Sequence, residues 1–228
     1  QYGVEDARIT KIDNKYYMTY VVVSEKEGVS TALANSKDMI NWNRMGIIFR
    51  LQNKDAVLFP EKIDNCYVAL HRPEGFFAFT KPSIWISHSP DLIYWGREKT
   101  LIQPRSKSWG DERVGAGCPP IKTKKGWLVI YHGVRGDGES RVYSAGAFLL
   151  DLKNPEIVLA RSNVSEPLFG PSYNFEKKGF IGNVVFPTAA IPSLDGESLL
   201  IYSGGADSVT TIRKIKIKHI MQQMENYG

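Results

Sequence analysis

Acidic and basic side chains stand close together near the start of the chain, where Glu5, Asp6 and Arg8 precede the apolar stretch 16–23. Side chains that follow one another on an extended strand point to opposite faces. We therefore expect one of Glu5 and Asp6 to face a central site while the other anchors the backbone. Arg8 shares a face with Asp6 and could pair with it or help to hold an anion. A solvated acidic turn ahead of a strand is the simpler alternative.

Polar residues also stand at the ends of three later apolar stretches, at matching offsets. Arg72 follows His71 at the end of the second stretch, His132 ends the third, and Asp207 follows the fourth. A buried strand end has no structural need for an arginine, a histidine or an aspartate at that place. Together with Asp6, these residues are predicted to converge on one site. If they do not converge, each is a capped, solvated strand end.

These residue types suit the cleavage of a glycosidic bond. Asp6 and Asp207 supply carboxyl groups, and Arg72, Lys122 and His132 supply cations. A glycosidase normally needs two carboxyl groups, one as acid and one as base or nucleophile. A phosphorylase needs only the acid, because inorganic phosphate is the attacking group, and phosphate needs Arg, Lys or His to hold it. Both reactions remain open from the residues alone.

The elements that would position these residues are short strands in repeated pairs. One unit is a strand end, a turn containing Asn or Gly, and an apolar strand. It recurs at 11–20, 62–71, 122–132 and, more loosely, 192–202. The turn needs positive φ, which Asn and Gly tolerate. A second unit, a strand that ends in Ser-x-Asp and is followed by Trp, occurs at 32–42 and 84–95. Both units predict β-hairpins.

A two-hairpin unit that returns about every 50 residues predicts an all-β fold, a β-propeller whose blades are the repeats. We expect a single propeller domain over 1–228 with about four blades, at 1–50, 51–105, 106–165 and 166–228. A β-sandwich also has short strands, but it does not predict the same unit four times. The one helical candidate is 218–226. The innermost strands of a propeller line one channel, where equivalent residues would meet.

Composition excludes several classes of protein. The formal net charge of +5 comes without a nucleic-acid-binding motif, so nucleic-acid binding is not favoured, whereas an anionic substrate such as phosphate is. No apolar run approaches the roughly 18 residues of a membrane helix. Cys66 and Cys118 form neither a disulfide framework nor a metal-binding spacing, which suits a reducing compartment and predicts a cytoplasmic protein. The Gly-rich segment 113–122 lacks the phosphate-loop and dinucleotide motifs and predicts a close backbone approach.

The chain resembles the β-mannoside phosphorylase family of glycoside-active enzymes. The likeness keeps its order over essentially the whole chain, in the stretches 4–9, 54–61, 71–73, 115–120, 131–134, 183–188 and 205–207. The resemblance implies a five-bladed β-propeller that cleaves β-mannosidic bonds with inorganic phosphate and inversion, giving α-mannose 1-phosphate. It implies a β-mannoside oligosaccharide and phosphate as partners, with phosphate as co-substrate and no cofactor or metal.

The resemblance also implies roles for single residues. Asp6 matches the general acid, which is thought to act through a sugar hydroxyl that relays the proton. The residues that match phosphate-binding positions are Arg72, Lys122, His132 and Lys54. The residues that fall on sugar-contacting positions are Tyr143, Phe186 and Asp207, and Arg8 joins them as a candidate. Core packing is the alternative role for Phe186.

Two departures from the family pattern keep other functions open. Family members carry roughly one further blade before the Glu-Asp motif, and this chain lacks it. Lys54 stands where some members carry Arg. A phosphate-independent β-mannoside hydrolase and a non-catalytic carbohydrate-binding propeller are therefore alternatives. A homo-oligomer is compatible with the sequence.

Overall fold

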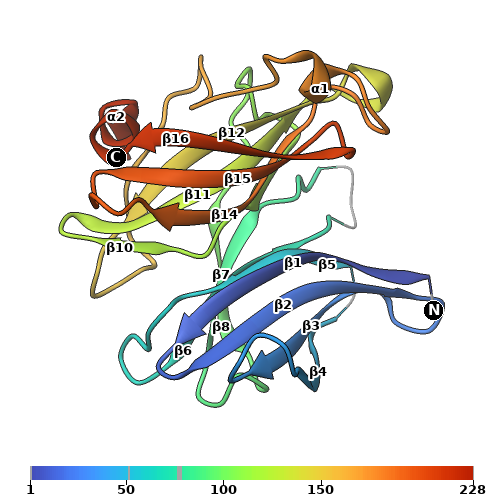
Figure 1. The fold of residues 1–228 in the computed structure, drawn as a ribbon, viewed down its shortest axis with the longest axis vertical. Coiled ribbons are helices and arrows are strands. Elements are labelled where there is room, and N and C mark those ends of the chain that lie inside the picture. The colour runs from blue at the N-terminus through green and yellow to red at the C-terminus, as the bar shows by residue number, and fades with distance from the viewer. Residues whose placement is uncertain (1, 51, 76–78, 228) are drawn as a thin grey trace.

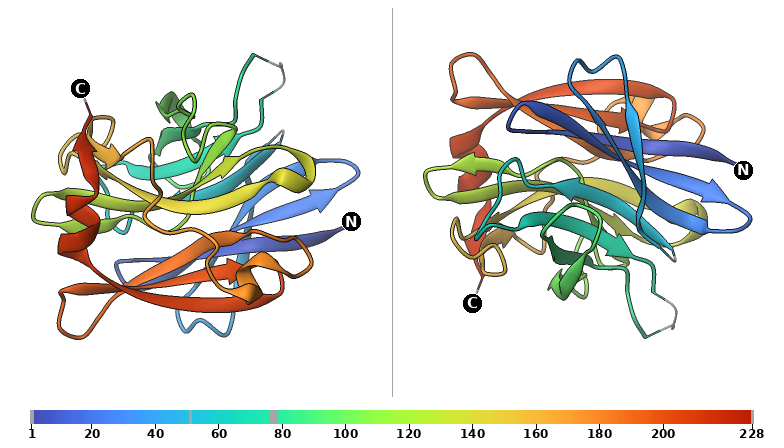
Figure 2. Two further views of the ribbon diagram at one scale, coloured as in Figure 1. Left: turned by 90° about the horizontal axis from the view of Figure 1, so that it is seen from above. Right: turned by 90° about the horizontal axis from the view of Figure 1, so that it is seen from below.

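The computed structural model describes residues 2–50, 52–75 and 79–227, and its fold is a ring of four small antiparallel sheets. In the view of Figure 1 the first and second sheets occupy the lower half and the third and fourth occupy the upper half; Figure 2 shows the ring from two further sides. The ring is a four-bladed β-propeller, which confirms the predicted fold class and excludes a sandwich.

The first two blades follow the predicted repeat closely. The first contains β1 (Gly3–Ile12), β2 (Lys15–Ser24), β3 (Gly28–Ser36) and β4 (Asn43–Phe49). The second contains β5 (Asn53–Leu58), β6 (Tyr67–Pro73), β7 (Ile84–Ser89) and β8 (Gly96–Ile102). Each is a four-stranded meander in which sequence neighbours pair.

The last two blades depart from the predicted ranges. The third sheet holds β9 (Arg113–Ala116), β10 (Ile121–Thr123), β11 (Gly126–Arg135), β12 (Val142–Leu150), β13 (Val158–Ser162) and, from the end of the chain, β17 (Met224–Asn226). The fourth keeps only β14 (Val185–Pro192), β15 (Ser198–Gly205) and β16 (Val209–Lys216). The helical candidate 218–226 was half right, because α2 (Ile217–Gln222) ends before β17 begins. A short helix α1 (Asn174–Lys177) and a 3-10 turn (Gly138–Ser140) were not predicted.

Side-chain hydrogen bonds explain why the Ser-x-Asp unit repeats. In the first blade, Asp38 Oδ1 accepts from the backbone N–H groups of Ile40 and Asn41. In the second, Asp91 Oδ1 accepts from Ile93 and Tyr94 in the same way. Each carboxylate thereby closes the turn between the third and fourth strands, since Asp readily bonds to backbone N–H groups two and three residues ahead.

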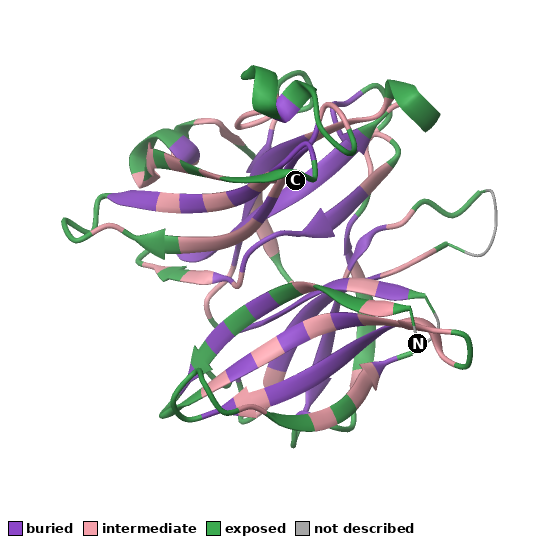
Figure 3. Cartoon of the chain, turned by 45° about the vertical axis from the view of Figure 1, so that its right-hand side comes forward, coloured by how far each residue is buried: buried purple, intermediate pink, exposed green. Residues whose placement is uncertain are grey.

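The core lies between the sheets. The innermost strands contact one another around the ring, β1 with β5, β5 with β9, and β14 with β1, while β11 and β12 contact β14. Figure 3 shows buried residues along the middle strands and exposed residues in the turns and helices. Both cysteines are free, Cys118 buried and Cys66 half-buried. Neither α1 nor α2, the α-helices of the described residues, has the length or apolar character that a membrane-spanning helix needs.

Trp127 joins the second and third blades in the largest core cluster. Its ring is fully buried, stands edge-on to Phe59 at 5.3 Å between centroids, and donates from Nε1 to Leu152 O. We expect Trp127→Ala to lower the free energy of unfolding by about 3–5 kcal/mol, because it leaves a cavity that the neighbours fill only partly. Urea unfolding followed by circular dichroism measures this. Tyr94→Ala, at a tyrosine that is 76% exposed, is the control and should change stability little.

Candidate active site

One cavity brings together five of the sequence-predicted residues, from all four blades. It has a volume of about 360 Å³ and is lined by Glu5, Asp6, Lys54, Tyr143, Phe180, Ile181, Val184, Phe186 and Asp207. It lies on the face of the propeller where β1 and β5 begin and where β6 and β15 end. Of the residues that the repeat analysis expected to meet, Asp6 and Asp207 line the cavity, whereas Arg72 and His132 do not; Lys54, Tyr143 and Phe186 were expected there from the resemblance.

A β-bulge aims Asp6 into this cavity. The pairing of β1 with β2 shifts register between Glu5 and Arg8, and Asp6 has φ +58°. This left-handed backbone is costly for a residue other than Gly and is often found at functional sites. The bulge also breaks the alternation of side chains, so Glu5 and Asp6 both line the cavity. The expectation that only one of them would face the site was therefore wrong.

The surroundings of Asp6 suit a general acid. Burial is the largest influence and raises the pKa of its carboxyl group. The negative charges of Asp55 and Glu5 raise this pKa further, whereas the positive charges of Arg8 and Lys54 lower it, and the net direction is upward. A raised pKa keeps a carboxyl group protonated closer to neutral pH, where it can donate a proton.

Lys54 is a cation inside the cavity. Its Nζ lies 3.0 Å from Glu5 Oε1 and 3.8 Å from Asp6 Oδ2. Burial lowers the pKa of this ammonium group, but its hydrogen bond to Glu5 and the negative charges of Asp6, Glu5 and Asp55 outweigh burial and raise it. Lys54 is therefore positively charged beside the candidate acid, where an anionic substrate would need it.

Arg72 and His132 lie behind Lys54 in a buried group around Asp55. Arg72 pairs with Lys54 in the register of β5 and β6, and its Nε donates to Asp55 Oδ2 at 2.5 Å. Its Nη1 donates to Glu74. His132 Nε2 lies 3.5 Å from the same Asp55 oxygen. Desolvation opposes the guanidinium charge, but the carboxylates of Asp55 and Glu74 outweigh it and raise the pKa of Arg72, so this cation persists at all working pH values.

His132 is a neutral side chain in this setting. Burial lowers its pKa to about 3, an effect that the charge of Asp55 opposes and the charges of Arg72, Arg8 and Arg113 reinforce. The sequence analysis counted His132 among the cations, and that part of the expectation was wrong. An uncharged imidazole can still donate or accept one hydrogen bond at each ring nitrogen.

Aromatic rings form the wall of the cavity next to His132. Phe186, at the start of β14, lies 4.6 Å from the His132 ring and 6.4 Å, edge-on, from the Tyr143 ring. Phe186 thus packs against its neighbours and faces the cavity, so core packing and sugar contact are compatible roles. Asp207 enters from the turn after β15, where Ala206 and Asp207 have φ +46° and +49°.

Arg8 does not line the cavity but supports the backbone next to it. Its side chain is 1% exposed. Nε donates to Gly117 O at 2.8 Å, and Nη1 donates to the backbone carbonyl of Asp6 at 2.6 Å. The guanidinium carbon lies 5.2 Å from the centre of the Phe186 ring. Arg8 therefore fixes the bulge that carries Asp6, which differs from the expected contact with an anion or sugar.

Lys122 lies apart from the other candidates. It is at the hairpin between β10 and β11, at the far end of the blades from Asp6, and its Nζ pairs with Glu61 at 2.6 Å. It lies 5.5 Å from the centre of the Trp127 ring. Lys11 over Tyr16 and Lys62 over Tyr67 repeat this contact at 5.6 and 4.4 Å. The number of residues from the lysine to the aromatic residue is the same in all three pairs. The contact of Lys122 with Trp127 is therefore a repeated feature of the scaffold, and the repeat is visible in the sequence.

Three residues near the site were missed from the sequence. Asp55 is buried against Arg72 and His132. Arg113 lies at the start of β9, and its positive charge lowers the pKa of His132. Phe180 lines the cavity and is 86% exposed. The signal for Asp55 was present, since Lys54-Asp55-Ala56 copies Glu5-Asp6-Ala7. Arg113 is the first residue of the innermost strand of the third blade, and Lys54 is the second residue of the innermost strand of the second blade.

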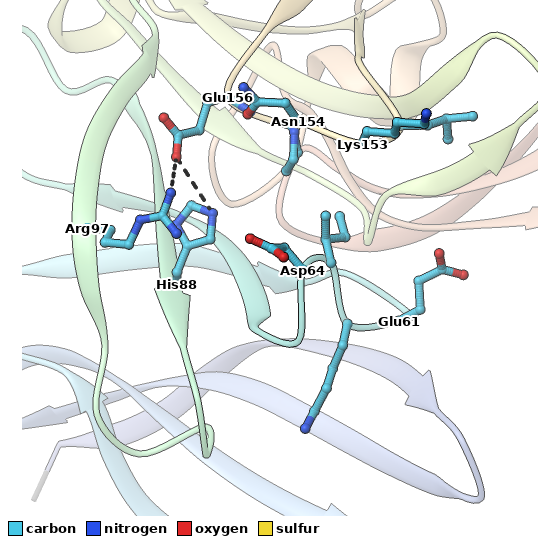
Figure 4. Close-up of a pocket in the computed structure, with 11 residues that line it drawn as sticks. Glu61, Asp64, His88, Arg97, Lys153, Asn154 and Glu156 are labelled. Atoms are coloured by element: carbon cyan, nitrogen blue, oxygen red, sulfur yellow. Dashed lines mark hydrogen bonds and ion pairs between the residues drawn. The ribbon is translucent and has the colours of Figure 1, made fainter.

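A larger cavity, of about 620 Å³, lies at the other end of the second and third blades. Figure 4 shows its charged side chains, among them Glu156 with dashed contacts to Arg97 and His88. Glu156 lies 3.3 Å from Arg97 and 3.6 Å from Lys99, so the charges there largely satisfy one another. Across the described residues, no three His, Cys, Asp or Glu side chains are placed to hold a metal ion.

Comparison with known proteins shows which family the chain matches. Residues 1–226 match the family glycoside hydrolase 130, described as beta-1,4-mannooligosaccharide phosphorylase. The chain is 42% identical over 220 residues to the 1,2-beta-oligomannan phosphorylase of Thermoanaerobacter sp. strain X514, covering 96% of this chain and 70% of that protein. It is 30% identical over 223 residues to the beta-1,4-mannooligosaccharide phosphorylase of Ruminococcus albus, covering 98% and 65%.

A solved structure gives the same result. The chain superimposes on the beta-1,2-mannobiose phosphorylase from Listeria innocua, in complex with beta-1,2-mannobiose, with a TM-score of 0.90 and 43% identity. The match covers 98% of this chain and 61% of that one, so this chain spans about 61–70% of the length of these relatives. The family match over residues 1–226, together with the shared fold, confirms the resemblance: the chain belongs to glycoside hydrolase family 130, the family of the mannooligosaccharide phosphorylases.

Proposed function

We propose that this protein is an inverting β-mannoside phosphorylase, which uses inorganic phosphate to cleave a β-mannosidic bond and releases α-mannose 1-phosphate. The observation that carries the proposal is the cavity in which Asp6, with its raised pKa, lies 3.8 Å from the cation Lys54, whose partner in the register of β5 and β6 is Arg72. One acid and several cations are what a phosphorylase requires, because phosphate is the nucleophile.

In this mechanism Asp6 gives its proton, directly or through a sugar hydroxyl, to the oxygen of the leaving sugar while the bond from that oxygen to C1 breaks. A phosphate oxygen forms the new bond to C1 from the opposite face, which inverts the configuration. Lys54, Arg72 and Arg113 supply positive charge for phosphate, and neutral His132 supplies a hydrogen bond. Lys122 is left out because it pairs with Glu61 at the far end of the blades.

Asp207, Tyr143 and Phe186 are proposed to hold the mannose. A carboxylate beside aromatic rings can accept hydrogen bonds from sugar hydroxyls while the rings pack on the apolar face of the sugar. The relatives at 42–43% identity are named for β-1,2-linked substrates and the one at 30% for β-1,4-linked substrates. We therefore propose β-1,2-mannobiose and its oligomers as substrates. Cytoplasmic location and homo-oligomerisation stay predictions.

The central test is a phosphate titration. Incubation with β-1,2-mannobiose should release mannose 1-phosphate in proportion to added phosphate, and β-1,4-mannobiose should react more slowly. Release of free mannose at equal rates with and without phosphate would identify a hydrolase. Binding of mannobiose with neither product formed would identify a carbohydrate-binding propeller. Ion chromatography of the products formed with and without added phosphate separates these outcomes.

Asp6→Asn tests the general acid. The amide cannot donate the proton, so turnover should fall by roughly 10²-fold or more. Glu5→Gln is the matched comparison, because Glu5 lines the same cavity but pairs with Lys54, and its loss should be smaller. Initial rates of mannose 1-phosphate release measure both variants. Similar losses in the two would remove Asp6 from its role.

The pair Arg72→Lys and Lys122→Met tests which cations hold phosphate. Arg72→Lys keeps the charge but loses the forked donor geometry of the guanidinium, so the KM for phosphate should rise about tenfold. Lys122→Met should leave this KM within about twofold, because a contact with Glu61 at the surface contributes little. A rise in the KM for phosphate in Lys122→Met would instead restore Lys122 to the phosphate site.

A further inference from the structure

The chain contains the backbone motif of the general acid twice. Glu5-Asp6-Ala7 on β1 is matched by Lys54-Asp55-Ala56 on β5, the equivalent strand of the next blade. Both strands shift register at this place, β1 after Glu5 and β5 after Lys54. Asp6 has φ +58° and Asp55 has φ +54°. Two aspartates with strained backbone in equivalent bulges are a specific feature of the fold, because a strained backbone conformation persists only where the surrounding structure stabilises it.

The two aspartates have opposite surroundings. The Asp6 side chain is 26% exposed and faces the cavity, whereas the Asp55 side chain is 2% exposed and makes an ion pair with Arg72. Burial raises the pKa of Asp55, but the positive charges of Arg72 and Arg8 and the hydrogen bond from Arg72 outweigh burial and lower it. Pairs of acids whose surroundings move their pKa values apart commonly have separate tasks in one reaction. Asp55 is thus held as a carboxylate, whereas the surroundings of Asp6 favour the protonated form of its side chain.

A glycine in the third blade makes room for this arrangement. Gly115 on β9 is paired in register with His132 on β11. A Cβ atom at Gly115 would overlap Asp55 Oδ2 and the His132 ring. The sequence analysis expected the Gly-rich segment 113–122 to bring its backbone close to something, and Asp55 with His132 is what it approaches. The buried group of Asp55, Arg72, His132 and Gly115 therefore spans the second and third blades.

We propose that Asp55 is a positioning residue, which holds Arg72 and His132 in place for phosphate and couples the phosphate site to the acid Asp6 through its negative charge. This inference rests on the proposed function. Asp55 touches neither the cavity nor a reacting atom; it acts through the two side chains that it contacts. No relative's name assigns this role, and it follows from the duplicated bulge and the shared oxygen Oδ2 alone.

The coupling to Asp6 has a definite sign. Besides burial, the charged groups that act on Asp6 are Glu5 and Arg8 on its own strand and Lys54 and Asp55 on β5. Asp207 and Tyr143 face it across the cavity. The negative charge of Asp55 disfavours a second negative charge on Asp6 and so raises the pKa of Asp6. Removal of that charge should lower the pKa of Asp6.

Asp55→Asn in the full chain tests both parts. The KM for phosphate should rise about tenfold or more, while the KM for mannobiose changes less than about threefold, because a hydrogen bond between charged groups is lost only at the phosphate site. The alkaline limb of the pH–rate profile, which reports the protonated acid, should move to lower pH. A purely structural role would not move this limb. A folded Asp55→Asn with both quantities unchanged overturns the inference.

Two further variants keep the test decisive. Asp55→Glu retains the negative charge but displaces it. The KM for phosphate should therefore rise, while the alkaline limb of the pH–rate profile should remain at the same pH. An unchanged KM in this variant also overturns the inference, even if Asp55→Asn fails to fold. Glu74→Gln is the matched control, because Glu74 pairs with the same Arg72 but does not act on Asp6. It should leave the alkaline limb in place.

Measurements without turnover separate this inference from the proposed function. Calorimetry with inorganic phosphate compares binding in the unmutated chain and in Asp55→Asn, and carbon NMR titration reports the pKa of Asp6 in each. A lower Asp6 pKa and weaker phosphate binding in Asp55→Asn support the inference. Equal values in both proteins refute it, whatever the products of mannobiose are. Absence of phosphate-dependent product from the unmutated chain refutes the proposed function.

Discussion

The ion pair between Asp55 and Arg72 is the contact on which the candidate site depends. Both side chains are almost fully buried, 2% and 5% exposed. Removing two charges from water costs several kcal/mol, and only good geometry with further hydrogen bonds repays that cost. Here Glu74 and His132 provide the further partners. Because an unpaired charge in this place would be severely destabilising, the pair fixes the position of Arg72, and with it the cationic side of the cavity.

The same backbone feature has two chemical outcomes in neighbouring blades. The bulge at Asp6 opens toward a cavity, where burial without a full set of partners raises the pKa of its carboxyl group. The bulge at Asp55 opens toward the third blade, where Gly115 leaves space and Arg72 supplies a partner. A propeller repeats local geometry, but each blade has different neighbours, and the neighbours decide whether an aspartate is an acid or an anchor.

Repetition itself separates scaffold from site. The contact of lysine with an aromatic ring occurs in three blades at the hairpin end, and the Ser-x-Asp turn occurs in two. These repeated contacts stabilise turns. Arg72 and Asp207 are not repeated in that way: Asp207 lines the cavity, and Arg72 pairs with the buried Asp55. Lys122 belonged to the repeated set, and its assignment to phosphate treated a scaffold residue as an exception.

The sequence by itself determined the propeller, most blade boundaries and the meeting of Asp6 and Asp207, because hairpin periodicity and turn chemistry are local properties of the chain. The positions of Lys54, Tyr143 and Phe186 were expected only from the family resemblance. Tertiary structure alone decided that Glu5 joins Asp6 in the cavity, that His132 is neutral, that Arg8 is a support and that β17 returns to the third sheet. Each of these depends on groups far away in the sequence. Burial and electric field at a residue are set by whatever the folded chain packs against it, and neither periodicity nor spacing carries that information.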